Sequence, residues 1–183
     1  QENIMHVVRE YNNMLNRLSD DERLLFRDRI HQADKKISAG LNKLSWNHKK
    51  VYGFMHDARR VAKEVNKDVT IYHEANRKIA EHCHVMANTL LVSFQKKEHK
   101  VYEFEAMQEK HRTMVREKFL QIHKDIKRIT RNTYQIFRLG SGDVQTEWVK
   151  YVLSIDEQVE EALRTTVKKS LQETQAVGLA IGT

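Results

Sequence analysis

The sequence of 183 residues contains no proline, only one cysteine and only six glycines. Average usage would supply roughly nine prolines in a chain of this length. Without proline, breaks between helices must come from glycine or from capping residues. The one cysteine, Cys83, cannot form a disulfide within the chain, which favours a reducing, intracellular compartment.

Long apolar runs are also missing. No run approaches the roughly 18 residues needed to cross a bilayer, and the start of the chain shows no signal-peptide pattern. The first residue is glutamine, and the last stretch, Gly178-Leu-Ala-Ile-Gly-Thr183, carries no helix cap. We therefore expect this sequence to be a fragment of a longer chain, with residues 177–183 as a truncated tail.

Motifs for catalysis or cofactor binding are absent from the sequence. It has no GxxxxGK[ST] loop and no HExxH, and Gly140-Ser-Gly142 lacks the lysine of a phosphate-binding loop. His82 and His84 flank Cys83, but on a helix they point about 200° apart and cannot share a metal ion. The pair Glu160-Glu161 is typical of solvated charge on a helix surface. The sequence thus predicts no catalytic residue, no cofactor and no metal site.

What the sequence does contain is a long heptad pattern. Apolar residues recur in steps of three and four, which predicts one long helix from Asn47 to about Phe94 with a narrow buried stripe. Every other segment is expected to pack against that stripe. Its members are Val51, Met55, Ala58, Ala62, Val65, Val69, Tyr72, Ile79, Cys83, Met86 and Leu90.

Two shorter helices are predicted before the long one. The first covers residues 2–18, and the second follows a capping box in which Ser19 and Glu22 satisfy each other's backbone N–H groups. Gly40 is expected to end the second helix in the left-handed conformation. The inner side of this second helix is expected to carry Leu24, Leu25, Ile30, Ala33 and Ile37.

Two further long helices are predicted after it. One covers residues 101–136, and the other begins with Asp143 as its cap, after the break at Gly140-Ser-Gly142. Residues 95–99 form either a turn, which we favour, or a stutter in a continuous helix. The predicted stripes are Val101, Phe104, Met107, His111, Val115, Phe119, Ile122, Ile126, Ile129, Thr133 and Ile136, then Trp148, Val152, Ile155, Val159, Leu163, Val167 and Leu171.

The predicted fold class is all-α: an elongated antiparallel bundle of long heptad-bearing helices with an N-terminal helical hairpin. The predicted parts are a hairpin at 1–39, a packed connector at 40–46, a long-helix bundle at 47–176 and the tail. Apolar and aromatic residues at the joints are the predicted structural anchors: Gly40, Leu41, Leu44, Trp46 and Trp148.

Positive charge is concentrated in residues 94–138, which hold twelve basic and six acidic groups, a net +6 of the chain's +7. Four of these groups, Lys124, Lys127, Arg128 and Arg131, lie on one side of their helix, opposite its apolar stripe. We call them the basic strip. It is either the solvated face of an amphipathic helix or a docking face for an acidic partner, a lipid surface or nucleic acid. No nucleic-acid reading motif accompanies it.

Several motifs resemble the N-terminal tail region of dynein heavy chains. They are Tyr11-Asn12 with Leu15, Leu18-Ser19 with Glu22 and Leu25, Asp34-Lys-Lys-Ile37, and Gly40-Leu-Asn-Lys-Leu-Ser-Trp-Asn47. Trp148-Val-Lys-Tyr-Val152 and Val167-Lys-Lys-Ser-Leu171 resemble the far end of the same region. The family's connector into a long helix, G-L-x-x-L-[TS]-W-[NS], is matched by residues 40–47. The sequence as a whole resembles axonemal heavy chains more than cytoplasmic ones.

The resemblance implies a non-catalytic structural and subunit-docking segment of a microtubule motor complex in the cytoskeleton, here the axoneme of a cilium or flagellum. The implied partners are dynein intermediate and accessory chains and a neighbouring heavy chain, with cargo or the axonemal doublet beyond. ATP hydrolysis would reside in a separate motor ring.

The sequence leaves two other functions open. The first, which is the main alternative, is a basic helical bundle that binds a membrane surface. An enzyme built on a helical bundle would need several inward Glu-x-x-His pairs, and only Glu81-x-x-His84 fits.

Overall fold

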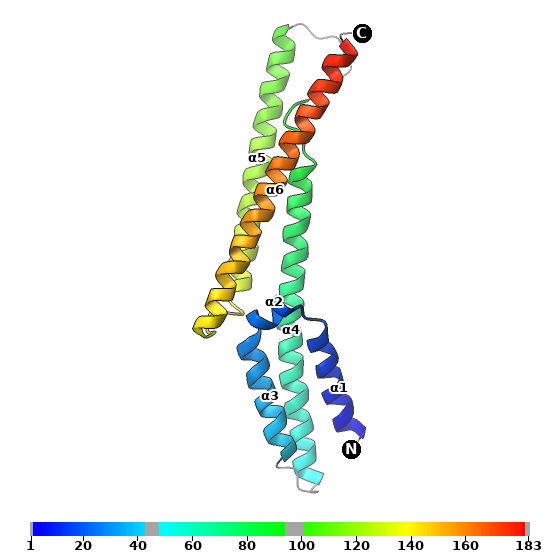
Figure 1. The fold of residues 1–183 in the computed structure, drawn as a ribbon, viewed down its shortest axis with the longest axis vertical. Helices are drawn as coiled ribbons and strands as arrows, with labels where there is room; N and C mark the ends of the chain where they lie inside the picture. The colour runs from blue at the N-terminus through cyan, green and yellow to red at the C-terminus, as the bar shows by residue number, and fades with distance from the viewer. Residues whose placement is uncertain (1, 43–47, 94–100, 182–183) are drawn as a thin grey trace. The chain divides into compact units, whose positions relative to one another are not determined.

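A computed structural model describes residues 2–42, 48–93 and 101–181 (Figure 1). These residues form six helices and contain no strand, which confirms the all-α fold class. The helices are α1 (Glu2–Asn16), α2 (Asp20–Leu25), α3 (Arg27–Asn42), α4 (His48–Ala87), α5 (Val101–Tyr134) and α6 (Gly142–Ile181).

The chain forms two compact units. The first consists of residues 1–74 and 133–151, and the second of residues 75–132 and 152–183. Helices α4 and α6 each contribute one part to each unit. The boundaries predicted from the sequence, with a hairpin at 1–39 and a bundle at 47–176, stay a prediction.

In the first unit, α1 and α3 run alongside the first part of α4 (Figure 1). Each helix turns its apolar stripe inward, because a helix buries one face only when that face carries apolar residues every three or four positions. The buried residues include Val7, Tyr11 and Met14 of α1, Ala33 and Ile37 of α3, and Ala58, Val61, Val65, Val69 and Tyr72 of α4. The predicted stripe is confirmed at Ala58, Val65, Val69 and Tyr72. Its other members in this part of α4, Val51, Met55 and Ala62, are half-buried, and Val61 is buried beside Ala62.

The predicted second helix is divided into α2 and α3. Ser19 caps α2 as expected, since its side chain accepts from the backbone N–H of Glu22 at 3.2 Å. The carboxylate of Glu22 lies instead 2.6 Å from His73 Nε2. Phe26 interrupts the helix with φ −87° and ψ 6°. The expectation that Gly40 ends the second helix is wrong, since α3 continues to Asn42. Glycine inside a helix costs about 1 kcal/mol relative to alanine, which a helix can tolerate, so a glycine does not by itself end one.

The second unit contains the end of α4, most of α5 and most of α6. Helix α4 ends at Ala87 and not near Phe94. Just beyond its end, the side chains of Asn88 and Thr89 donate hydrogen bonds to the carbonyls of His84 and Val85 in its last turn. Leu90 therefore lies outside the helix. Residues 95–99 lie outside the described residues, but α4 and α5 are separate helices, so one continuous helix is excluded.

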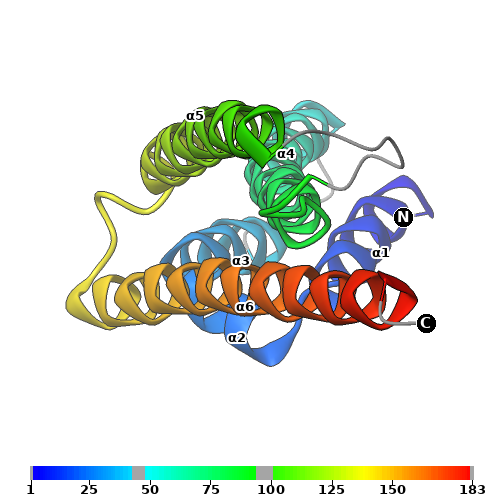
Figure 2. The ribbon, with the colours of Figure 1, turned by 90° about the horizontal axis from the view of Figure 1, so that it is seen from above.

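The start of α6 also differs from the prediction. Gly142 is its first residue, and the N–H of Gln145 donates to the carbonyl of Ser141 at 3.0 Å. Asp143 is thus in the first turn and is not the cap. At Gly140, an added Cβ would lie 2.6 Å from Val144 Cγ1, so this tight connection from α5 to α6, the yellow loop of Figure 2, requires glycine.

The predicted apolar stripe of α6 is wrong in its second half. Leu163, Val167 and Leu171 are 40%, 45% and 58% exposed. Their neighbours toward the N-terminus are buried instead: Ala162, Thr166 and Ser170. From Ile155 onward the predicted stripe advances in four consecutive steps of four residues. A helix has about 3.6 residues per turn, so each such step rotates the stripe by about 40°, and Leu171 lies about 160° away from Ile155. Leu24, Val101 and Phe104 are likewise exposed, contrary to expectation.

Polar contacts hold the shifted stripe of α6 in the second unit. The Thr166 hydroxyl donates to the carbonyl of Thr89, and the N–H of Leu91 donates to Ser170 Oγ at 2.9 Å. On the other side, His111 Nε2 lies 2.8 Å from the carbonyl of Leu90. The residues that follow α4 are therefore fastened by side chains from both α5 and α6.

Candidate functional site

Aromatic side chains meet in the first unit, and we call Phe26, Tyr72, Phe137, Trp148 and Tyr151 the aromatic cluster. The rings of Phe26 and Phe137 have centroids 4.9 Å apart at 74°, and those of Tyr72 and Phe137 are 5.9 Å apart at 89°. Trp148 lies 5.6 Å from Phe137 and 5.0 Å from Tyr151. Such edge-to-face and tilted pairs add to the free energy gained from burial.

Burial in the cluster is nearly complete at its centre. Phe26 is 0% exposed and Phe137 is 2% exposed. Desolvation, followed by the neighbouring Tyr72, raises the pKa of Tyr151 well above its usual range. The cluster therefore has a water-excluding centre, and its rings belong to α4, α6 and two connecting turns. It forms the joint between these segments.

Polar contacts close the rim of this joint. The carboxylate of Asp28 accepts from the backbone N–H of Ser141 at 2.6 Å and from its hydroxyl at 3.1 Å. Arg27 forms an ion pair with Asp143. Gln145 Nε2 donates to the carbonyl of Phe137 at 2.8 Å. The start of α3 is thus linked directly to the connection between α5 and α6.

The predicted anchors fall in two groups. Trp148 is 8% exposed and belongs to the aromatic cluster. Gly40 and Leu41 belong to the last turn of α3, where only the backbone is described. Leu44 and Trp46 lie outside the described residues. The anchor role of these five residues stays a prediction.

The basic strip lies on α5 in the second unit, and all four of its side chains are exposed. Arg128 forms an ion pair with Asp125 at 3.2 Å, so the carboxylate compensates part of the positive charge of Arg128. Ile122 and Ile126 on the opposite side of α5 are buried. The strip is therefore the outward face of this helix, as the spacing predicted, and its role in docking stays a prediction.

Three of the histidine, cysteine and carboxylate candidates, Cys83, His84 and Glu161, line one pocket between α4 and α6. Cys83 is buried, and this burial raises the pKa of its thiol. His84 instead lies beside Asn88 on the helix surface. Glu160 and Glu161 both pair with Arg164, at 3.8 and 3.1 Å. Across the described residues, no three His, Cys, Asp or Glu side chains come together in a metal-binding group.

Hydropathy gives one further structural result. In the ranges that the structure describes, none of the helices combines the length and the apolar character that crossing a bilayer would require.

Known proteins match this chain closely. The family model described as dynein heavy chain, N-terminal region 1, matches residues 1–54. The dynein-1-beta heavy chain of the flagellar inner arm I1 complex of Chlamydomonas reinhardtii is 34% identical over 178 residues, 94% of this chain and 4% of that protein. Dynein axonemal heavy chain 2 of Homo sapiens and of Mus musculus are each 35% identical over 175 residues, with the same shares covered.

This chain belongs to the dynein heavy chains. It spans about 4% of the length of the relatives that it matches. The match to the N-terminal region identifies it as a tail segment of the heavy chain and not as its catalytic motor domain. The flagellar and axonemal relatives confirm the expected place in the axoneme of a cilium or flagellum.

Some residues of this dynein tail segment could not be found from its sequence pattern. Phe26 and Phe137 lie outside the predicted stripes, yet they form the centre of the aromatic cluster. The contact of Asp28 with Ser141 joins residues with no shared motif. The one available signal was the glycine at position 140, which marked a tight turn three residues after Phe137.

Proposed function

We propose that this chain is a non-catalytic structural and docking segment of an axonemal dynein tail. In this role it links the motor to intermediate and accessory chains, to a neighbouring heavy chain, and to cargo or the axonemal doublet. The longer heavy chain would be an ATP-driven microtubule motor. The observation that supports this most strongly is the match to axonemal heavy chains over 94% of the chain.

The architecture supports a role in transmitting load. Two helices of 40 residues, α4 and α6, each contribute to both compact units. At about 1.5 Å per residue each helix extends for roughly 60 Å. A force applied along such a helix acts on many buried contacts at once, among them the aromatic cluster.

The basic strip is the proposed docking face for an accessory subunit. Its cations point away from the buried side of α5, so a partner can reach them without unfolding the helix. Complementary charge mainly sets the rate and specificity of association. The proposed partner surface is therefore acidic.

The test is binding of the 183-residue chain to purified dynein intermediate chain, measured by isothermal titration calorimetry. The strip variant Lys124→Glu/Lys127→Glu/Arg131→Glu is expected to bind at least about tenfold more weakly. The matched control, Lys35→Glu/Lys36→Glu/Lys78→Glu, makes the same change in net charge at exposed positions elsewhere. Equal binding by both variants would remove the strip as the docking face, and absence of binding to any dynein subunit would reject the docking function.

A membrane surface is the second candidate, and the exposed cations of the strip favour it. Leu120, 52% exposed, lies on the same side of α5 and is a single apolar side chain for insertion. Stable membrane association by an amphipathic helix needs a larger apolar face together with its charge. Sedimentation with anionic liposomes at low salt separates the two functions, because the dynein-tail proposal expects the chain to stay in the supernatant.

A further inference from the structure

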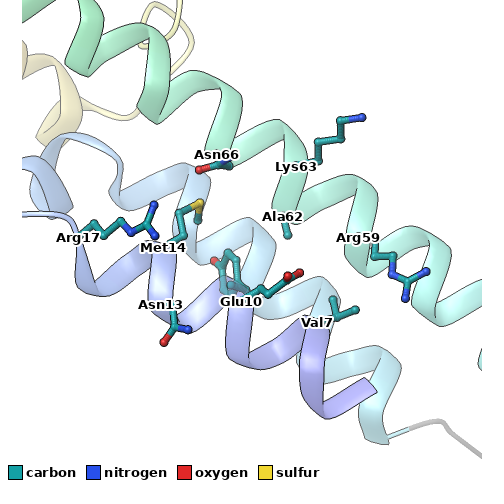
Figure 3. A pocket seen from close by; sticks show the side chains of 10 residues that line it. Val7, Glu10, Asn13, Met14, Arg17, Arg59, Ala62, Lys63 and Asn66 are labelled. Carbon is teal, nitrogen blue, oxygen red and sulfur yellow. The ribbon is translucent and has the colours of Figure 1, made fainter. Parts of the chain in front are cut away.

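A groove lies between α1 and α4, within the first unit (Figure 3). Its volume is about 470 Å³, within the range of ligand-binding pockets. Val7, Tyr11 and Met14 of α1 line it and are buried by the packing of that helix on α4. The small side chain of Ala62 lies opposite them on α4, which leaves the space above it open. We call this feature the α1–α4 groove.

Three cations are among the residues that line the groove: Arg17 from α1 and Arg59 and Lys63 from α4. All three side chains are exposed, and none has a hydrogen bond or ion pair with any residue that the structure describes. Nearby arginines differ, since Arg23 donates to the carbonyl of Leu15 at 2.9 Å and Arg60 lies 3.9 Å from Asp57. The groove therefore collects uncompensated positive charge around an apolar floor.

One acidic side chain, Glu10, also lines the groove. Its carboxylate lies 3.6 Å from His6 Nδ1, on its own helix, and its side chain is 68% exposed. With three cations and one carboxylate, the lining keeps a charge of +2. Asn13 and Asn66 add amide groups that can donate hydrogen bonds to carboxylates or to a peptide backbone.

We propose that the α1–α4 groove binds a short acidic segment of a partner protein. One apolar side chain of that segment fills the space over Ala62, and its carboxylates pair with Arg17, Arg59 and Lys63. The part of α4 that lines the groove, from Arg59 to Asn66, extends for about 11 Å, so the occupant contributes about two helical turns.

The chemistry of the groove favours a peptide over other polyanions. Nucleic acid binding uses a longer track of phosphate contacts, often with aromatic platforms for the bases. A lipid surface is flat and does not enter a groove between two helices. An apolar floor with three cations in the lining instead matches an amphipathic acidic segment, whose apolar anchors give affinity and whose charges give specificity.

This site is separate from the basic strip. The groove belongs to the first unit and the strip to the second, and the two share no residue. The proposal for the groove can therefore be rejected without rejecting the proposal for the basic strip, and the reverse also holds.

The experiment uses the full 183-residue chain and a fluorescein-labelled amphipathic peptide of about twelve residues, with leucine along one face and glutamate elsewhere. Fluorescence anisotropy gives the dissociation constant. The groove variant Arg59→Glu/Lys63→Glu is expected to bind at least about tenfold more weakly. The control Lys78→Glu/Lys168→Glu makes the same change in net charge at exposed positions outside both the groove and the basic strip, and it should bind within about twofold of the parent chain.

Two further variants test the details without adding negative charge. Glu10→Gln removes the competing carboxylate and is expected to tighten binding by about twofold to fivefold. Ala62→Leu fills the floor of the groove and is expected to weaken binding with no change in charge. Thermal melting of each variant by circular dichroism establishes that the chain is folded.

The proposal is overturned if the parent chain does not bind the peptide, or if the groove variant and the control lose affinity equally. It is also overturned if Ala62→Leu binds as the parent does, because binding would then depend on net charge alone. Sedimentation with phosphatidylserine vesicles supplies the remaining arm. Vesicle binding that Arg59→Glu/Lys63→Glu abolishes, without peptide binding, would assign the groove to lipid and reject the peptide.

Discussion

The rings of Phe26 and Phe137 meet edge to face, with their centroids 4.9 Å apart. Neither residue belongs to one of the six helices: Phe26 separates α2 from α3, and Phe137 lies in the connection between α5 and α6. Both side chains are almost fully buried. Connecting residues thus supply the centre of the first unit, and the aromatic cluster forms only when these two turns come together.

Phe26→Ala is therefore expected to lower the free energy of unfolding by about 3–5 kcal/mol, through lost burial and the cavity left behind. Urea denaturation followed by circular dichroism measures this change. The matched control is Phe104→Ala, because Phe104 is 43% exposed on α5 and its truncation should cost within about 0.5 kcal/mol. Similar losses for both variants would contradict the central role of Phe26.

The helices themselves followed from the sequence. The heptad stripe of α4 predicted Val65, Val69, Tyr72, Ile79 and Met86 as buried, and the structure confirms this. The pattern works because a helix repeats its faces regularly and every stripe must find apolar cover. The first three residues after Ser19 also carry the acidic charge expected at a helix start.

The contacts between distant segments could not be predicted in the same way. The outward turn of Leu163 and Val167 reflects accumulated drift of the stripe along α6 and the polar partners available to Thr166 and Ser170. The α1–α4 groove depends on which cations lack partners, and that depends on neighbours far apart in sequence. A single sequence carries the period of each helix but not the identity of the residues that it meets.

Asp28 gives a second test of the joint, since its carboxylate accepts two hydrogen bonds from Ser141. Asp28→Ala is expected to destabilise the chain by about 1–2 kcal/mol, because a charge-assisted pair at a partly exposed site is lost. Asp156→Ala, at an exposed position on α6, is the control and should change stability by less than about 0.5 kcal/mol. Chemical denaturation at neutral pH compares the two, and equal effects would show that the contact with Ser141 adds nothing.

The burial of Tyr11 predicts that the chain loses stability at alkaline pH. Burial, and then the nearby charge of Asp34, raise the pKa of its phenol above the ordinary value of 10.0. The folded state therefore holds this proton more tightly than the unfolded state, so the free energy of unfolding falls as the pH rises above about 10. Tyr11→Phe should make this fall shallower above about pH 10 and leave the stability profile below that pH unchanged in shape, as measured by urea titrations.

The control for Tyr11 is Tyr52→Phe, at a position that is 71% exposed on α4. That variant should reproduce the pH dependence of the parent chain. If Tyr11→Phe also reproduces it, the phenol of Tyr11 does not contribute to alkaline unfolding.

Thr166 provides the test for the second unit. Its side chain is 1% exposed, and its hydroxyl donates to the carbonyl of Thr89, just beyond the end of α4. Thr166→Val keeps the shape but removes the donor and leaves that carbonyl without this partner, so we expect a loss of about 1–3 kcal/mol. Thr165→Val is the neighbouring control, because the Thr165 hydroxyl donates only to Glu161 within its own helix at 2.8 Å. Urea denaturation should therefore show a clearly larger loss in the free energy of unfolding for Thr166→Val than for Thr165→Val. A larger loss for Thr165→Val would show that the contact between Thr166 and Thr89 does not fasten the end of α4 to α6.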